Sequence, residues 1–231
     1  MARTRAADYD DKRKALLAVA ARLFAAQGFD RTSIAEIAGK ACVSKALLYH
    51  YYPGKSALLY DIIREHLAYV ADALAVADDP SAPPEQHLLG LVQATLFAYR
   101  DADALHKVQL NELEKLGENE RREVHSLERE IVETVARAVK RLNPGLLDRD
   151  DAALLKPLTM SLFGVLNWTY LWFRDDGKLS REDYAKLATR LFVEGVARLK
   201  DADEPAADLR LAKADAGKPD SPLPLRERGR G

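Results

Sequence analysis

Apolar residues recur at helical spacing through most of the chain, in stretches separated by short polar breaks. In the stretch 10–27, Leu16, Leu23 and Phe24 fall on one helical face. Runs of alternating β-branched residues, which would indicate strands, are absent. The sequence therefore predicts an all-α fold, with further helices over 55–77, 85–101, 103–117, 119–142, 150–174 and 180–200.

Two proline-containing breaks and two polar ends divide this helical pattern. "DDPSAPP" at 78–84 and "NPGLLD" at 143–148 cannot continue a helix. The segment 1–9 is short, polar and basic, and it predicts a flexible arm. The last 31 residues hold four prolines and no aromatic residue, and predict disorder. The expected boundaries separate residues 1–56, 57–200 and 201–231.

The stretch 33–54 predicts two short helices joined by a tight turn. Ser33 and Glu36 have the spacing of a capping box that starts the first helix. A turn follows over 39–43, Ser44 can cap the second helix, and Pro53 ends it. Together with the helix that precedes them, the two short helices form a helix-turn-helix unit.

The second short helix has one apolar and one polar face. Val43, Leu47 and Leu48 are expected to be buried. Helical geometry then turns Lys45, Ala46, Tyr49 and His50 outward, with Tyr51 close by. An anchored helix with such an outer face is suited to the major groove of DNA.

The exposed groups match the chemistry of a duplex. Lys45 can donate to guanine O6 or N7, and Ala46 can contact a thymine methyl group. Thr32 and Ser33 begin the preceding helix and are placed for a phosphate, while Lys55 starts the next helix on the same side. The predicted DNA-binding residues are Thr32, Ser33, Ser44, Lys45, Ala46, Tyr49, His50, Tyr51 and Lys55.

The alternative is an ordinary three-helix packing unit whose tyrosines lie at the edge of the core. The charge distribution favours DNA binding. Residues 1–56 hold ten Lys/Arg against five Asp/Glu, a net charge of +5, whereas the rest of the chain carries −6. A basic front on an acidic body indicates that the front meets a polyanion.

Catalytic and metal-binding signatures are absent from the sequence, so we expect no enzyme, no metal site and no cofactor. His66, His87, His106 and His125 lie nineteen to twenty-one residues apart on different predicted helices. Each is expected to be a surface or partly buried histidine, although convergence of two of them stays open. No apolar run reaches the length of a membrane span, and Cys42 is the single cysteine, so we expect a cytoplasmic protein without a membrane partner.

The run "RTSIAEIAGKACVSKALLYHYYPGKSALL", with "LFAAQGFDRTS" upstream, closely resembles the DNA-binding domain of the TetR family of bacterial repressors. The resemblance implies a homodimer on a palindromic operator of double-stranded DNA, released by a small-molecule effector held in the C-terminal domain. Lys45, Ala46, Tyr49 and Tyr51 match positions of base or backbone contacts, and Lys55 matches a phosphate contact. Cys42 stands where the family usually has Gly, so either Cys42 accepts a strained backbone or the turn differs.

The segment 161–199 predicts a helix that is apolar all round, followed by an amphipathic helix. Such a pair fits a four-helix bundle between two subunits, which makes 57–200 the ligand-binding and dimerisation domain. Trp168 and Trp172 fit either dimer packing or ligand contact.

The part "NWTYLWFRDDGKLSREDYAKLATRLFVEGV" resembles TetR regulators of fatty-acid, phenylacetate and steroid catabolism, which respond to acyl-CoA thioesters. Under that resemblance an acyl-CoA effector needs an apolar slot and cations for its phosphates. The candidates for the slot are Phe97, Leu110, Leu113, Phe163, Asn167 and Trp168, and those for the phosphates are Arg100, Lys107, Arg121, Arg122 and Arg174.

Two other functions remain open at this point. A repressor of drug efflux would sense cationic amphiphiles through buried carboxylates facing aromatic rings, and Glu112 and Glu114 would favour it if the fold brings them near Trp168. A helical enzyme acting on acyl-CoA is remote, because the sequence contains no base and nucleophile pair.

Overall fold

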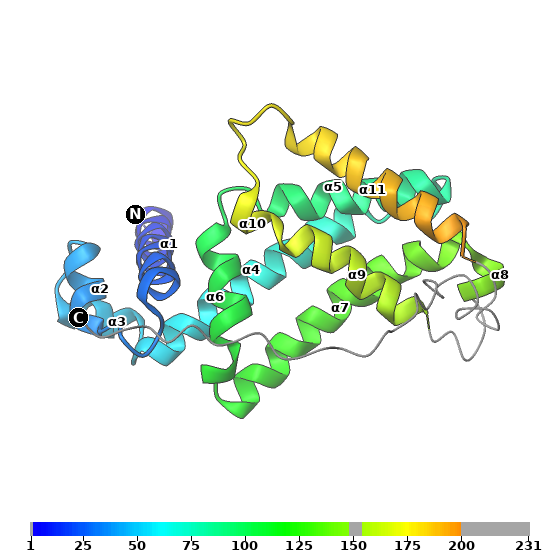
Figure 1. Ribbon diagram of the computed structural model, residues 1–231. Helices are drawn as coiled ribbons and strands as arrows, with labels where there is room; N and C mark the ends of the chain where they lie inside the picture. Colours follow the sequence, from blue (N-terminus) through cyan, green and yellow to red (C-terminus); the bar gives the residue numbers. More distant parts are fainter. Residues whose placement is uncertain (1, 148–153, 200–231) are drawn as a thin grey trace, which may run out of the picture. The chain divides into compact units, whose positions relative to one another are not determined.

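The computed structural model describes residues 2–147 and 154–199, and every regular element within them is a helix, which confirms the all-α class. The tail expected at 201–231 lies outside the described residues. The helices are α1 (Ala2–Gln27), α2 (Ile34–Lys40), α3 (Lys45–Tyr51), α4 (Lys55–Ala77), α5 (Pro84–Ala98), α6 (Asp103–Glu112), the 3₁₀ turn η1 (Leu113–Lys115), α7 (Glu118–Leu142), α8 (Pro144–Leu147), α9 (Leu155–Asn167), α10 (Thr169–Trp172) and α11 (Arg181–Ala197) (Figure 1).

Helices α1, α2 and α3 form the expected helix-turn-helix unit. α2 packs against both α1 and α3, and α1 packs against α4. Phe24, Ile37 and Leu48 supply its core and are at most 1% exposed. Within the basic arm expected at 1–9, residues 2–9 are instead the first part of α1, because the sequence contains no helix breaker before Gly28.

Backbone geometry in the two turns follows from single residues. Gly28 ends α1 with a φ of +86°, a left-handed conformation that glycine adopts without steric cost. Cys42 adopts a φ of +56° in the α2–α3 turn. Of the two alternatives for Cys42, the strained backbone is therefore the one observed, and α3 keeps its place after the turn.

The caps of the two short helices hold as predicted, with one difference. Ser33 and Ser44 each accept a hydrogen bond through Oγ, from the amides of Glu36 and Leu47 respectively, at 3.1 Å. The Glu36 carboxylate does not close a reciprocal capping box, because its Oε2 accepts from Gln27 Nε2 at 2.8 Å. Glu36 therefore joins α2 to the end of α1.

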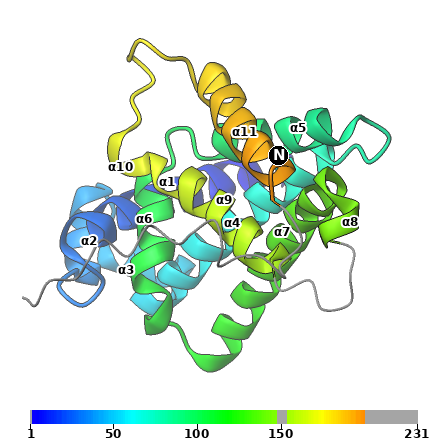
Figure 2. The same ribbon diagram turned by 45° about the vertical axis from the view of Figure 1, so that its right-hand side comes forward.

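α4 is the central helix of the larger part of the chain and packs against α5, α6 and α7. α9 packs against α7 and α5, and α11 packs against α5 and α7, so that α5 and α7 lie between α4 and the last helices (Figure 2). α6 packs against α1 as well as α4. This contact joins the DNA-binding unit to the rest, and Met1–Ala197 form one compact unit.

Three predicted helices end earlier than expected. α5 stops at Ala98, before Asp101 turns the chain with a φ of +57°. α6 tightens into η1 after Glu112, and the helix expected over 150–174 divides into α9 and α10 at Trp168. No helix in the described ranges is both long and apolar enough to span a membrane.

Candidate functional site

The outer face of α3 is the candidate DNA-reading surface. Leu48 is fully buried, whereas Lys45, Ala46, Tyr49 and His50 are exposed, Tyr49 by 54%. The exposure predicted for these four side chains is confirmed. Their contacts with bases stay a prediction.

Two tyrosines fasten the end of α3. Tyr51 is half-buried and stacks on Tyr9 of α1, with 4.5 Å between ring centroids. Tyr52 is buried, and its hydroxyl donates to Asp61 Oδ2 on α4 at 3.1 Å. Burial and the nearby Asp61 carboxylate raise the pKa of Tyr52, which keeps this hydroxyl protonated and able to donate. The orientation of α3 is therefore fixed from α1 and from α4.

Two residues at the start of α2 were predicted to bind a phosphate, and only one of them has an exposed hydroxyl that can still donate a hydrogen bond. Thr32 is 2% exposed, and its Oγ1 donates to the Gly28 carbonyl at 2.9 Å while accepting from Gln27. This hydroxyl closes the α1–α2 loop, and the phosphate contact of Thr32 stays a prediction. Ser33 is exposed, and its capping oxygen still carries a hydroxyl hydrogen that can donate outward.

Lys55 also has partners within the protein. Its Nζ lies 2.8 Å from the Phe29 carbonyl oxygen and 3.2 Å from those of Asp30 and Thr32. The same ammonium lies 4.3 Å from the centre of the Phe29 ring. An ammonium group has three N–H donors, and these three carbonyls account for all of them. Lys55 therefore holds residues 28–32, here called the 28–32 loop, and its phosphate contact stays a prediction.

The 28–32 loop is held from its other side by α6 and η1. Glu112 Oε1 accepts from the Phe29 amide at 3.2 Å, and Lys115 Nζ lies 2.5 Å from Asp30 Oδ2. The Lys115 ammonium lowers the pKa of Asp30. The sequence pattern contained no signal for these contacts, because they join residues more than eighty positions apart.

The slot predicted for a ligand does not form as expected. Phe163 is buried and Leu113 is half-buried. Phe97, Leu110 and Trp168 are 44%, 45% and 60% exposed, so they lie on the surface. The helix divides at Trp168 and turns that indole outward.

Most of the cations proposed for phosphates have protein partners. Arg121 pairs with Glu114 at 2.9 Å, Arg122 donates to Asn119, and Arg174 pairs with Asp176 at 2.9 Å. Lys107 is exposed beside the end of α1. Since Glu112 binds the 28–32 loop and Glu114 binds Arg121, neither supplies the buried carboxylate that a site for cationic drugs requires.

A buried polar cluster occupies the centre of the larger part of the chain. His66 and His106 are 3% and 2% exposed, and His66 Nε2 lies 3.4 Å from His106 Nδ1. Tyr99 packs against both rings and donates through its hydroxyl to Asn167 Oδ1 at 2.8 Å. Burial lowers the pKa of each histidine to about 4, so both rings are neutral at pH 7. Two of the scattered histidines thus converge, and they are buried more deeply than expected.

A cavity of about 350 Å³ adjoins His66, between α1, α4 and the α5–α6 connection. Of the residues predicted to bind a ligand, Arg100 alone lines it. In the described part of the chain, no group of three His, Cys, Asp or Glu residues could hold a metal ion. The lining residues are Lys14, Leu17, Ala18, Ile62, Glu65, His66, Tyr69, Ala98, Arg100, Asp101, Ala102 and Leu105.

Comparison with known families assigns both parts of this structure. Residues 16–62 match the family described as bacterial regulatory proteins of the tetR family, and residues 81–196 match the tetracyclin repressor-like C-terminal domain. The chain belongs to the TetR family. TetR proteins are DNA-binding transcriptional repressors and not enzymes, and they typically bind operators as dimers under the control of small molecules.

Individual relatives cover the chain to different extents. A TetR-family regulator from Bordetella parapertussis is 32% identical, with a TM-score of 0.74 over 82% of this chain and 98% of its own. AibR, solved with isovaleryl coenzyme A and operator DNA, is 26% identical, with a TM-score of 0.66 over 78% of this TetR chain and 97% of its own. The repressor KstR2 of Mycolicibacterium smegmatis is 26% identical over 107 residues, 46% of this chain and 52% of its own, so the match spans about half of that relative.

The structural role of Lys55 predicts a contrast with Lys45. Lys55→Met leaves three carbonyls of the 28–32 loop without their donor, and should lower the free energy of unfolding by about 1–3 kcal/mol. Lys45→Met removes the same charge from an exposed position and should change it by less than about 0.5 kcal/mol. Urea unfolding at matched protein concentration measures both.

Operator binding separates the two lysines in a second way. Lys45→Met should cost about 1–3 kcal/mol of operator affinity. Lys55→Met should weaken binding without changing the slope of log K against log salt, because Lys55 releases no counterion from a phosphate. A slope reduced by about one for Lys55→Met, with normal stability, would restore the phosphate contact.

Proposed function

We propose that this TetR protein is a homodimeric repressor, acting in the cytoplasm, that an acyl-CoA or aryl-CoA thioester releases from a palindromic operator. The proposal is supported by two contacts of the 28–32 loop, one with Lys55 of α4 and one with Glu112 of α6. These contacts join the DNA-binding unit to both helices. Any ligand that shifts these two helices must also shift α2 and α3.

A dimer is supported by apolar surface on the last helices. Val165, Trp168 and Trp172 of α9 and α10 are 48%, 60% and 51% exposed. On α11, Leu187 and Leu191 are 46% and 68% exposed. Monomeric proteins rarely leave such a group of large apolar side chains in water, whereas a two-fold four-helix bundle would bury them. This supports the dimer-packing alternative for both tryptophans.

α4 has the contacts needed to transmit a movement. Its first residue, Lys55, holds the 28–32 loop. At its far end Asp78 accepts from His87 at 2.6 Å and from Arg137 at 3.1 Å, and Arg141 donates to His87 at 2.8 Å. The far end of α4 is thus anchored to α5 and α7, and the near end can swing with the DNA-binding unit.

Because effector binding and DNA binding are thermodynamically linked, a small movement of α4 is sufficient to release the operator. An effector must bind more tightly to the shape that fits DNA poorly, and the coupling is reciprocal. The two recognition helices of a dimer must lie about one helical turn of DNA apart, roughly 34–36 Å. A ligand that spreads them breaks this match without unfolding any element.

The class of effector comes from the relatives. The AibR structure contains isovaleryl coenzyme A, and the segment 167–196 resembles the branch that responds to acyl-CoA. The efflux alternative is less favoured, because Glu112 accepts from the Phe29 amide and Glu114 pairs with Arg121.

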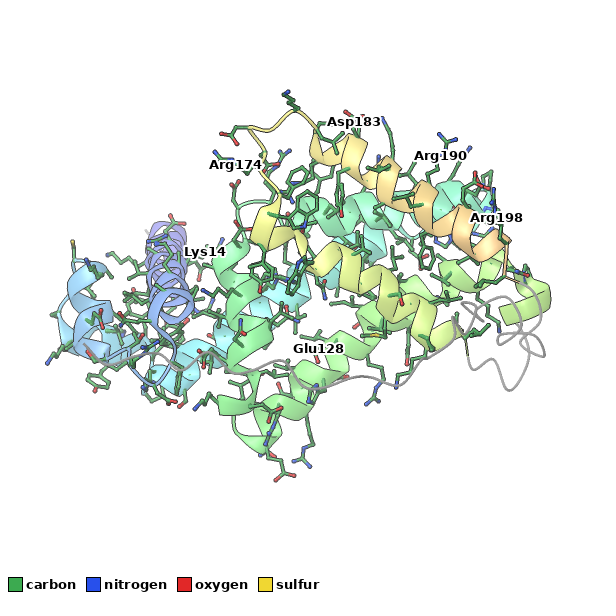
Figure 3. All side chains as sticks on the ribbon, viewed as in Figure 1. Lys14, Glu128, Arg174, Asp183, Arg190 and Arg198 are labelled. Carbon is green, nitrogen blue, oxygen red and sulfur yellow. The ribbon has the colours of Figure 1, made fainter. Side chains whose placement is uncertain are left out.

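If the apolar face of α11 forms the dimer interface, a charge placed on it should dissociate the dimer. Leu191→Glu places a carboxylate in the apolar face of α11, where pairing of two subunits would leave it without a partner. Sedimentation velocity should show monomers, and operator affinity should fall with the dimer. Arg190→Glu on the same helix, labelled in Figure 3, is the control and should leave the dimer intact. An unchanged Leu191→Glu dimer would place the interface elsewhere.

The effector class predicts which molecules release the operator. Isovaleryl-CoA, octanoyl-CoA and phenylacetyl-CoA, titrated against the complex with fluorescently labelled operator, should include at least one ester that lowers its anisotropy to that of free DNA. The corresponding free acids and cationic dyes serve as controls and should leave the complex intact. Release by free acids or cationic dyes alone would exclude the CoA assignment.

A further inference from the structure

The cavity between α1 and α4 has the composition of a small-molecule site. Its floor is apolar and buried, with Leu17, Ile62 and Ala102 between 1% and 6% exposed. Its volume of about 350 Å³ falls in the range of about 300–1,000 Å³ typical of ligand pockets. Such a floor favours an aliphatic or aromatic group over a charged one.

One polar group interrupts this floor. His66 lines the cavity, and its Nε2 faces His106 Nδ1 at 3.4 Å. In residues 2–147 and 154–199, no hydrogen bond involves His66 Nδ1, whereas His106 also has a hydrogen bond with the Asn167 backbone. A buried polar atom without a partner costs free energy, so the pair is a place where a ligand can supply a missing bond.

The neutral pair can present a donor to the cavity. Each neutral imidazole carries one N–H. The 3.4 Å contact fits two tautomers; in the one that a donor to the cavity requires, His106 Nδ1–H donates to His66 Nε2, and the proton of His66 stays on Nδ1, on the residue that lines the cavity. This N–H suits an uncharged acceptor such as an acyl carbonyl. Because burial keeps both rings neutral at pH 7, the pair offers a carboxylate no charge.

We propose that this cavity holds the acyl end of the effector, with the thioester carbonyl accepting from His66. The inference rests on the proposed function and locates its ligand. Lys14 and Arg100, exposed at the rim, then face the polar, anionic remainder of the coenzyme (Figure 3 labels Lys14 on α1). The rim also carries two carboxylates, of which Glu65 is paired with Arg13 and Asp101 is exposed.

This location couples binding directly to the DNA-binding unit. Lys14, Leu17 and Ala18 belong to α1, whereas Ile62 and His66 belong to α4. A ligand that fills the cavity therefore pushes on the contact between α1 and α4, and α1 leads into the 28–32 loop. The effector acts as a wedge at the junction.

A pair of tryptophan substitutions on α1 tests the location. Ala18→Trp adds an indole at an exposed position that lines the cavity, and Ala15→Trp adds the same side chain to an exposed position outside it. Calorimetric titration of the DNA-free proteins with isovaleryl-CoA and phenylacetyl-CoA should show at least about tenfold weaker binding for Ala18→Trp than for wild type. Ala15→Trp should bind as wild type does.

The outcomes separate the site from the proposed function. Wild type that binds no CoA ester contradicts the proposed function and the site with it. If wild type binds a CoA ester and Ala18→Trp binds it equally well, the proposed site is wrong. The same conclusion follows if both variants lose binding equally. In either case the proposed function as an acyl-CoA-responsive repressor still stands. Loss in Ala18→Trp alone supports the cavity.

A second comparison tests the proposed hydrogen bond between His66 and the thioester carbonyl. Wild type should bind isovaleryl-CoA about fivefold to tenfold more tightly than the 3-methylbutyl-CoA thioether, which lacks the carbonyl. His66→Leu, checked for folding by circular dichroism, should bind both equally. If wild type binds the thioester and the thioether equally, the proposed role of His66 is wrong. The role is also wrong if His66→Leu still prefers the thioester.

Discussion

The ammonium group of Lys55 determines where the DNA-reading helix lies. It gathers the carbonyls of Phe29, Asp30 and Thr32, which lie in the 28–32 loop directly after α1. Because α2 starts directly after the 28–32 loop, and α3 packs on α2, this one group sets the frame for both short helices. Glu112 completes the frame from α6.

The magnitudes explain how such a small contact can regulate DNA binding. Allosteric coupling between two sites typically amounts to about 1–3 kcal/mol. One hydrogen bond to a charged group contributes about 1.5–3 kcal/mol, so the Glu112–Phe29 contact alone is of the required size. The effector therefore need not unfold or repack the core. It needs only to shift α4 or α6 against α1 by enough to lengthen a few hydrogen bonds around the 28–32 loop.

Local chemistry explains what the sequence could predict. The caps at Ser33 and Ser44 and the buried Leu48 each depend on residues within a few positions, and all three were predicted. The exposed face of α3 follows from the same short-range geometry.

Long-range contacts explain what the sequence could not predict. Lys55 and Thr32 have the right positions for phosphates along the chain, but backbone carbonyls nearby in space take their donors. For Trp168 the sequence left ligand contact and dimer packing open, because its helix is apolar all round and only packing decides which side faces water. The pairing of His66 with His106 spans forty residues, and neither has a local signal for it.

The distance between recognition helices in the dimer tests the account most directly. Cys42, the single cysteine, is exposed in the α2–α3 turn, so a spin label there reports the position of α3 without further substitution. Pulsed electron resonance on the doubly labelled dimer should give one narrow distance with operator, and a longer or broader distribution with an acyl-CoA that releases it. The same distance in both states would contradict a movement of the DNA-reading helices.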